Sequence, residues 1–254
     1  MAVALVTGAG SGIGRATARR FAADGHAVVC ADLSEDAARD VAAEIAAAQG
    51  EAVPVTVDVA DEASVARMVE AAVGWRGGLR IVVANAGAMV EGDLLSLTLA
   101  DWNRALAVNA TGAFLTARAT MPHLVADGSG ALVFTASTVA LAGMKGVAAY
   151  AAAKGAVAAL TRQLAADFAP RGVRVNAVAP GAVRTPLSES QFRARAADEA
   201  QFEALLAQVI ARYPLPRWGR PEEIAEAILF LATDRSSWMT GQILPVEGGL
   251  LEVR

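Results

Sequence analysis

The sequence predicts an α/β fold in which helices cover both faces of a doubly wound parallel sheet, in one domain of 254 residues. Three observations support this. Short, almost continuously apolar segments alternate with longer segments of helical spacing, as in a sheet buried on both faces. A glycine-rich turn separates the first apolar segment from the first helical one. No repeat, linker or change of composition divides the chain.

Seven strands are predicted from the apolar segments. They cover Val3–Val6, Ala27–Cys30, Val53–Val57, Ile81–Val83, Leu132–Phe134, Val173–Val178 and Ile243–Val246. Helical spacing covers Ile13–Ala23, Ala37–Ala48, Ser64–Val73, Trp102–Leu124, Tyr150–Phe168 and Glu222–Leu231. Right-handed crossovers between parallel strands give a doubly wound sheet, and such sheets bind ligands beyond the carboxyl ends of their strands. We therefore expect the functional residues in the loops that follow strands.

The composition favours a soluble, cytoplasmic protein. The longest stretch without a charge, Gly128–Met144, is too short and too rich in Ser, Thr and Gly for a membrane span, and it is expected to form a buried strand followed by a loop. The N-terminus does not resemble a signal peptide. A net charge of −4 gives no electrostatic reason to expect nucleic-acid binding.

Cysteine and histidine give no sign of redox or metal chemistry. Cys30 is the only cysteine, so no internal disulfide can form, and its apolar surroundings indicate a buried thiol. His26 and His123 are far apart in the sequence with no cysteine beside them. We expect no metal site.

The first strand leads into the turn TGAGSGIG, from Thr7 to Gly14. Glycines here allow a tight turn and let the backbone approach a pyrophosphate, while the next helix offers free N–H groups. Alone, the motif is also compatible with a purely structural turn. Asp32 ends the second strand 18 residues after Gly14, near the spacing of an acid that binds the adenosine ribose; a solvated strand-end Asp is the alternative.

Tyr150 and Lys154 form a YxxxK pair on one face of a predicted helix, and Ser137 precedes Tyr150 by thirteen residues. The chain has two tyrosines and two lysines, so a chance pairing at this spacing is improbable. A free tyrosine has a pKa near ~10, and a nearby ammonium group favours the phenolate.

With the further segments ANAG (Ala84–Gly87), VNATG (Val108–Gly112), PGAVRT (Pro180–Thr185) and TGQILPVEGG (Thr240–Gly249), these motifs resemble the short-chain dehydrogenase/reductase family along essentially the whole chain. Ala84 and Glu247 stand where many members carry Asn and Asp. The resemblance implies a Rossmann-type fold and an NAD-dependent enzyme that transfers hydride between the nicotinamide and a secondary alcohol or ketone.

The same resemblance implies roles for four side chains. Tyr150 is expected to be the general acid and base, and Lys154 to lower its pKa and bind the nicotinamide ribose. Ser137 is expected to hold the substrate oxygen, and Asn109 to hold a water in a proton relay. From the residues alone, a polar break in a helix is the alternative for Asn109, and a loop hydroxyl that caps a backbone group is the alternative for Ser137.

The resemblance also implies cofactor contacts along the carboxyl edge of the sheet. They are Gly8, Ser11, Gly12, Ile13 and Gly14 for the pyrophosphate, Asp32 for the ribose, Asp58 and Val59 for adenine, Asn85, Ala86 and Gly87 for the adenosine ribose and pyrophosphate, Tyr150 and Lys154 for the nicotinamide ribose, and Pro180, Gly181, Val183 and Thr185 for the nicotinamide. Asp58 has an alternative role as an N-terminal cap for a helix starting at Asp61.

A mobile lid over the substrate is expected at about residues 188–213, where Phe202, Leu205, Leu206, Val209 and Ile210 have amphipathic helical spacing. Packing against the sheet edge is the alternative. Small and apolar residues at 140–145 and 88–91 are expected to form other walls, with Lys145 or Arg184 available to an acidic substrate. A neutral, fairly apolar alcohol or ketone is favoured.

Three other functions remain open. A dinucleotide-binding regulator without chemistry would be expected to lack catalytic side chains. An NADPH-dependent carbonyl reductase would carry a basic residue near the glycine turn or after the second strand, and an epimerase or dehydratase would be expected to be longer. The alanine-rich helices Trp102–Leu124 and Tyr150–Phe168 offer apolar surface to a second copy, and the family resemblance implies that they pair across a two-fold axis in a D2 homotetramer, with a dimer as the second choice.

Overall fold

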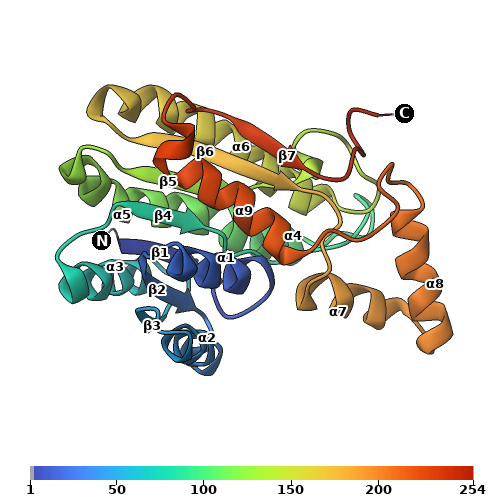
Figure 1. Cartoon of the computed structure of the whole chain (residues 1–254). Helices are drawn as coiled ribbons and strands as arrows, with labels where there is room; N and C mark the ends of the chain where they lie inside the picture. The colour runs from blue at the N-terminus through green and yellow to red at the C-terminus, as the bar shows by residue number, and fades with distance from the viewer. Residues whose placement is uncertain (1–2, 254) are drawn as a thin grey trace.

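The computed structural model describes residues 3–253, which form a seven-stranded parallel sheet with the strand order β3-β2-β1-β4-β5-β6-β7 (Figure 1). The strands are β1 (Val3–Thr7), β2 (Ala27–Asp32), β3 (Ala52–Thr56), β4 (Ile81–Ala84), β5 (Ala131–Thr135), β6 (Arg174–Pro180) and β7 (Ile243–Val246). The order reverses between β1 and β4, so the carboxyl ends of these two strands flank the switch point where such sheets bind ligands. The predicted fold class is confirmed.

Helices cover both faces of this sheet (Figure 1). They are α1 (Gly12–Ala23), α2 (Glu35–Ala47), α3 (Glu62–Arg76), α4 (Leu99–Leu106), α5 (Gly112–Asp127), α6 (Ala148–Phe168), α7 (Pro186–Arg195), α8 (Glu199–Ile210) and α9 (Pro221–Ala232). Short 3-10 turns lie at Thr138–Ala140, Ala169–Arg171 and Asp234–Ser236. Among the described residues, no helix is long and apolar enough to cross a membrane.

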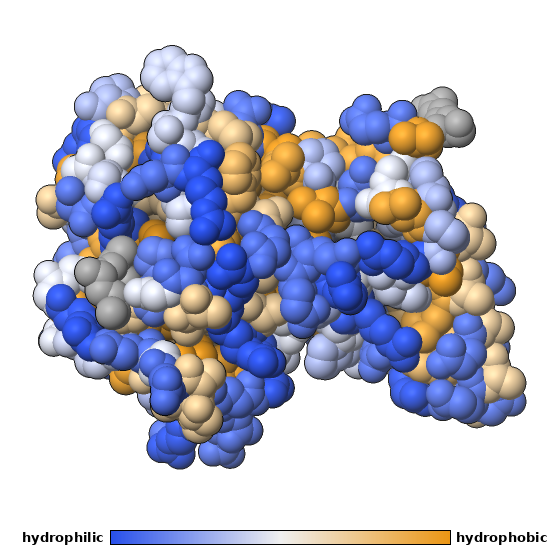
Figure 2. Space-filling model, in the orientation of Figure 1, coloured by the Kyte–Doolittle hydropathy of each residue, from blue (hydrophilic) through white to orange (hydrophobic). Residues whose placement is uncertain are grey.

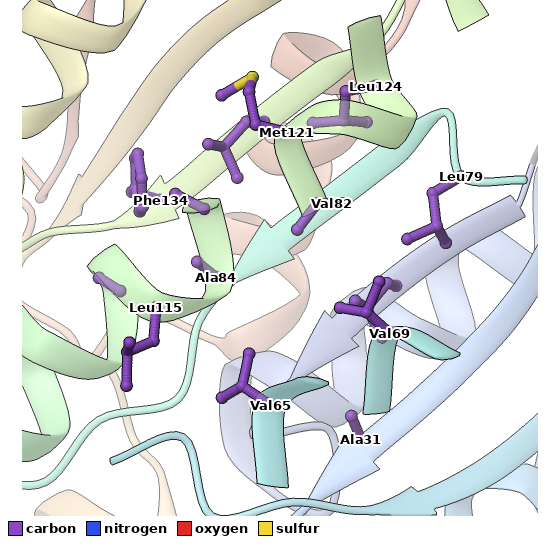
Figure 3. Close-up of a cluster of buried hydrophobic side chains, with 14 of the residues drawn as sticks. Ala31, Val65, Val69, Leu79, Val82, Ala84, Leu115, Met121, Leu124 and Phe134 are labelled. Carbon is purple, nitrogen blue, oxygen red and sulfur yellow. The ribbon is translucent and has the colours of Figure 1, made fainter. Parts of the chain in front are cut away.

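Alternate side chains of the strands enter two cores. In β1, Leu5 packs with α3, α5 and α6 on one face, and Val6 packs with α1, α2 and α9 on the other. Figure 3 shows the first of these cores, where Phe134 of β5 and Leu115 of α5 lie among the buried side chains. Because both faces are covered, the strands are apolar at nearly every position, as the sequence indicates.

The helix predicted over Trp102–Leu124 is interrupted. A π-helical turn, Ala107–Thr111, separates α4 from α5. Asn109 lies in this turn, and its amide donates hydrogen bonds to the carbonyls of Ala88 and Ala105. The side chain thus bonds backbone outside the regular helical ladder, and the helix continues through Asn109 as a π turn. Single π turns of this kind are frequent at functional sites.

The segment expected as a lid at 188–213 contains two helices, of which the sequence predicted only the second. The first, α7, begins at a capping box in which Thr185 and Ser188 bond each other's backbone N–H groups, with Pro186 at the first helical position. α7 buries no residue, and α8 buries Phe202 and Leu206. The pair projects from the body of the molecule (Figures 1 and 2).

Candidate active site

The turn between β1 and α1 has a backbone that only glycine can follow closely. Gly8 and Gly12 have φ angles of +65° and +51°. A Cβ atom at Gly14 would lie 1.9 Å from the carbonyl oxygen of Gly8. The first turn of α1 therefore packs directly against the turn. Ser11, at the N-cap position of α1, makes no side-chain capping hydrogen bond within the described part of the chain, so the N–H groups at this helix end are available to an anion.

Asp32 stands beside this turn at the end of β2. Its Oδ2 accepts a hydrogen bond from the Gly10 N–H at 2.8 Å, and its Oδ1 accepts one from the Ser34 N–H at 3.0 Å. The next residue, Leu33, is 71% exposed. Arg15, the first basic residue after the glycine turn, forms an ion pair with Glu44. Neither Leu33 nor the glycine turn therefore supplies a cation beside the Asp32 carboxylate.

Two threonines that the sequence analysis did not single out hold the ends of the central strands together. The Thr7 hydroxyl accepts hydrogen bonds from the N–H groups of Asn85 and Ala86, both at 3.1 Å. Asn85 in turn donates to the Thr7 carbonyl and accepts from the Thr135 hydroxyl, each at 3.1 Å. A hydroxyl at the last position of β1 and of β5, where the strands are otherwise apolar, is the signal that marks them.

The predicted catalytic residues lie next to these strand ends. Tyr150 and Lys154 are on the first turns of α6, with the Lys154 Nζ 5.7 Å from the centre of the Tyr150 ring. Lys154 is 3% exposed, and its Nζ donates a hydrogen bond to the Thr135 carbonyl at 2.7 Å. Ser137 hydrogen-bonds Tyr150. The Ser137 hydroxyl also accepts from the Val139 N–H at 3.4 Å, so its predicted alternative role as a local cap is present too.

The two ionisable groups respond to burial in opposite directions. Burial raises the pKa of Tyr150 to about 12, against a smaller lowering by the hydrogen bond with Ser137. Burial lowers the pKa of Lys154 to about 8. The sequence analysis expected Lys154 to bring the tyrosine pKa below its ordinary value. Among the protein's own groups this expectation is wrong, because loss of solvent disfavours the phenolate more than its neighbours favour it.

Asn109 supports the wall behind these residues. It is 1% exposed, and its Oδ1 accepts from the Ala88 N–H at 3.3 Å while its amide bonds the Ala88 carbonyl. A Cβ atom at Gly87 would lie 2.9 Å from the Asn109 Oδ1 and 3.4 Å from the Lys154 Nζ. Asn109 and Lys154 thus approach Gly87 closely and leave no room for a larger side chain there.

A cavity of about 1080 Å³ connects all these elements. It is large enough for a dinucleotide and a small substrate together. Of the predicted site residues, those on its wall are Gly8, Ser11, Gly12, Ile13, Asp32, Asp58, Val59, Asn85, Ala86, Gly87, Ser137, Tyr150, Lys154, Pro180, Gly181, Val183 and Thr185. Gly14 and Asn109 lie behind the wall. Asp58 is not the cap of α3, because that position belongs to Asp61, which accepts from the Ser64 N–H.

The other end of the cavity is lined by α7, α8 and nearby loops. Apolar side chains here are Met89, Met144, Val147, Leu187, Phe192, Leu205, Val209 and Trp218. The sequence pointed to Lys145 or Arg184 as possible cations. Lys145 lines the cavity, whereas Arg184 pairs with Glu189 and does not line it. Arg195 in α7 and Arg212 in the turn after α8 also line it, and neither was predicted because both lie in segments with the composition of a solvent-exposed surface.

Comparisons with known proteins agree with this geometry. A family model described as Enoyl-(Acyl carrier protein) reductase matches residues 8–251. The chain is 44% identical to cis-4-hydroxycyclohexanecarboxylate dehydrogenase of Sinomonas cyclohexanicum, over 99% of the chain and 97% of that protein. It is 38% identical to 2,5-dichloro-2,5-cyclohexadiene-1,4-diol dehydrogenase of Sphingobium indicum, over 97% of the chain and 95% of that protein.

Solved structures are also similar along the whole chain. A variant of actinorhodin polyketide ketoreductase, solved with NADPH, has a TM-score of 0.94 and 33% sequence identity, and the match covers 99% of this chain and 97% of that one. The similarity thus includes the glycine turn, the cavity and the α7–α8 segment.

Proposed function

Because the chain belongs to the short-chain dehydrogenase/reductase family, we propose that Tyr150 is the general acid and base of its reaction. The enzyme is an oxidoreductase that transfers hydride between a nicotinamide dinucleotide and a secondary alcohol or ketone. The observation that carries the proposal is one cavity lined by Tyr150, Lys154 and Ser137 and also by the glycine turn and Asp32.

The residues fit a dinucleotide at the carboxyl edge of the sheet. The backbone of the glycine turn is packed so closely that a Cβ atom at Gly8 or Gly14 would clash with Ala86 or with the Gly8 carbonyl, and the adjacent end of α1 can offer its N–H groups to phosphate. Asp32 can accept hydrogen bonds from a ribose, and Lys154 can donate them at the other end of the cavity. The bound dinucleotide supplies the ring carbon that accepts or gives up the hydride.

Tyr150 accepts or donates the proton in the proposed reaction. In alcohol oxidation, the carbinol carbon loses its hydride, and the carbinol oxygen loses its proton to the Tyr150 phenolate as the carbonyl forms. In ketone reduction, the phenol returns the proton. Ser137, which already hydrogen-bonds Tyr150, can donate to the same substrate oxygen and stabilise its developing charge. Lys154 can donate hydrogen bonds to the nicotinamide ribose beside Tyr150, and Asn109 fixes the adjoining backbone.

We expect NAD in preference to NADP. Asp32 would repel the 2′-phosphate of NADP, and Leu33 and Ser11 offer no compensating cation, while Arg15 is paired with Glu44. Steady-state kinetics with both cofactors should show at least a tenfold preference for NAD in kcat/KM, or about 1.4 kcal/mol. A preference for NADP would support the carbonyl-reductase alternative and contradict the role given to Asp32.

The substrate is proposed to be a secondary alcohol on a six-membered ring, or the matching ketone. Both named relatives act, by their names, on six-membered ring alcohols, and the substrate end of the cavity is lined mainly by apolar side chains. A screen of cyclohexanols and open-chain alcohols, followed by the absorbance of the reduced nicotinamide, tests this. Absence of turnover with every alcohol and ketone would favour the regulator alternative.

A homotetramer is proposed as the assembly. An apolar groove of about 370 Å³ between α5 and α6 is lined by side chains that include Phe114, Met121, Leu160, Leu164 and Phe168. Phe114 is 44% exposed in the single chain. A second copy packed on these helices would bury the groove, and a further contact would complete D2 symmetry. Light scattering on the purified protein should give four chains, and Leu164→Asp should give a smaller species. A wild-type monomer at micromolar concentration would refute the proposal.

A further inference from the structure

Both tyrosines of this chain, Tyr150 and Tyr213, line the same cavity. Tyr213 follows α8, at the end of the projecting segment. Its hydroxyl oxygen accepts a hydrogen bond from the Ala182 N–H at 2.8 Å. Its ring lies against two glycines: a Cβ atom at Gly181 would be 3.1 Å from the ring, and one at Gly248 would be 3.3 Å from it. The Tyr213 hydroxyl is therefore held in one place.

The Tyr213 hydroxyl has a hydrogen-bonding capacity that the protein leaves unused. The N–H of Ala182 occupies an acceptor site of the oxygen, and no acceptor for the phenolic proton is found within residues 3–253. Burial, the largest influence, raises the pKa of Tyr213, so the phenol keeps its proton at neutral pH. A phenol that accepts one hydrogen bond is also a better donor of the next. Tyr213 thus presents a fixed donor at the cavity wall.

Arg212 lies beside this donor and also lines the cavity. It is close enough for its charge to act on the Tyr213 phenol. Within the described part of the chain, Arg212 has no ion-pair partner, whereas Arg195 on the same cavity pairs with Glu91 at 3.4 Å. The other carboxylates on the cavity wall, Asp32 and Asp58, follow β2 and β3 at the opposite side of the sheet. The Glu247 carboxylate also acts on the Tyr213 phenol, but Glu247 does not line the cavity. Among the described residues on the cavity wall, the cations Arg212 and Lys145 have no ion-pair partner.

We propose that Tyr213 and Arg212 together bind a carboxylate of the substrate, remote from the carbinol that Tyr150 deprotonates. This inference rests on the proposed function and narrows its substrate class to ring hydroxy acids. The phenol donates one hydrogen bond to a carboxylate oxygen, and the guanidinium supplies the opposite charge and further donors. A neutral substrate was predicted because the sequence contains no arginine cluster, and the place of Arg212 and Tyr213 on the cavity wall depends on the fold.

Binding of a compound that cannot react gives the first test. Cyclohexanecarboxylate has the ring and the carboxylate but no carbinol, so calorimetric titration measures its affinity independently of turnover. We expect it to bind the NAD-loaded wild-type enzyme at least tenfold more tightly than the neutral cyclohexanecarboxamide. Tyr213→Phe and Arg212→Gln should each reduce that preference at least fivefold. Equal affinity for the two compounds in the wild type would overturn the proposal.

Kinetics separate recognition from a merely structural role. The quantity compared is the ratio of kcat/KM for 4-hydroxycyclohexanecarboxylate to that for cyclohexanol. Tyr213→Phe keeps the ring between the glycines but removes the donor, and we expect the ratio to fall at least tenfold, as for a lost hydrogen bond to a charged group. If Tyr213 only supports the Ala182 backbone, both substrates lose equally, the ratio is unchanged, and the proposal is wrong.

Arg184→Gln is the matched control. Arg184 belongs to the same region but pairs with Glu189 away from the cavity, so its loss should leave the ratio within twofold of the wild type. A ratio that falls as much in this control as in Arg212→Gln would show a general effect of charge and overturn the specific site. Failure of the proposed function has a different signature, since cyclohexanol and the hydroxy acid would then both fail to reduce NAD while cyclohexanecarboxylate still binds.

Discussion

The two sides of the cavity are held in place by different kinds of contact. On the sheet side, Thr7, Asn85, Thr135 and Lys154 are joined by hydrogen bonds between the ends of three strands and α6. On the other side, α7 buries no side chain, and its links to α8 and to the loop after β4 include the exposed ion pairs Arg193–Glu199 and Arg195–Glu91. Pairs of this kind contribute about 0–1 kcal/mol each.

This difference separates a preformed half from an adjustable one. The sheet side can hold reacting groups in fixed positions before any ligand binds, which is what general acid–base chemistry requires. The α7–α8 segment can shift at little cost and is suited to close over a substrate, as we propose for this lid. The predictions below test whether chemistry and stability belong to the first side and substrate affinity to the second.

The largest effect is expected at Tyr150. Tyr150→Phe removes the proton acceptor but leaves the glycine turn and Asp32 in place, so kcat should fall by ~10²–10⁴ while NAD affinity stays nearly unchanged. Steady-state kinetics and calorimetric titration of NAD provide the two measurements. If the variant retained most of the wild-type kcat on a good substrate, the proposed role of Tyr150 would be wrong.

Replacing a buried phenylalanine by alanine should have different effects on the two sides of the cavity. Phe134 and Phe202 are 0% and 1% exposed. Phe134→Ala opens a hole in the core of the sheet (Figure 3) and should cost about 3–5 kcal/mol in the free energy of unfolding. Phe202→Ala should loosen α8 from α7, change global stability by less than ~1 kcal/mol, and raise the KM of the alcohol. Urea denaturation and kinetics measure both. Equal losses of stability would mean that the two sides unfold as one unit.

Two glycines give a matched pair on the rigid side. A Cβ atom added at Gly14 would lie 1.9 Å from the Gly8 carbonyl oxygen. A Cβ atom added at Gly74 in α3 would meet nothing within 4 Å. Gly14→Ala should therefore cost about 1–3 kcal/mol or more and weaken NAD binding. Gly74→Ala should stabilise the protein by up to ~1 kcal/mol through helix propensity. Thermal melts with and without NAD distinguish them, and equal effects would contradict the close packing at the glycine turn.

The sequence predicted the sheet side of the cavity well, because the backbone geometry there restricts which residues can occupy each position. Strands buried on both faces must be apolar throughout, and the Gly8–Gly14 turn admits only glycine at its closest contacts. The sequence therefore located all seven strands within a few residues, and the predicted cofactor contacts except Gly14 line one cavity.

The sequence contains weaker signals for the α7–α8 side of the cavity. α7 has no buried residue and so no hydrophobic period, and the signals that mark its start are the Thr185–Ser188 capping box and Pro186. Arg212 and Tyr213 are polar residues in a solvent-rich segment, and their position in the cavity depends on how that segment folds back. The Tyr150 pKa was misjudged for a related reason, since a motif names the neighbouring charge but does not reveal the degree of burial.

The smallest effect concerns the pH dependence of stability and arises from Lys154. Its pKa is lowered by burial to about 8 in the folded protein, whereas an unfolded lysine keeps its proton up to about 10.4. Between these values the unfolded state binds more protons, so the free energy of unfolding should rise with pH, by at most about 1.4 kcal/mol per unit. Below pH ~8 both states are protonated, and the contribution is constant.

Urea denaturation of the wild type and Lys154→Met at pH 7, 8, 9 and 10 isolates this contribution. The wild type should gain stability relative to the variant from pH 8 to 10. Tyr150, with its pKa raised to about 12, acts in the opposite direction only above the ordinary tyrosine value of about 10, outside this window. Lys145→Met, which removes the chain's other lysine from an exposed loop, controls for the loss of a lysine charge. A difference between wild type and Lys154→Met that does not change with pH would mean that Lys154 is solvated and that the sheet side is less rigid than its hydrogen bonds indicate.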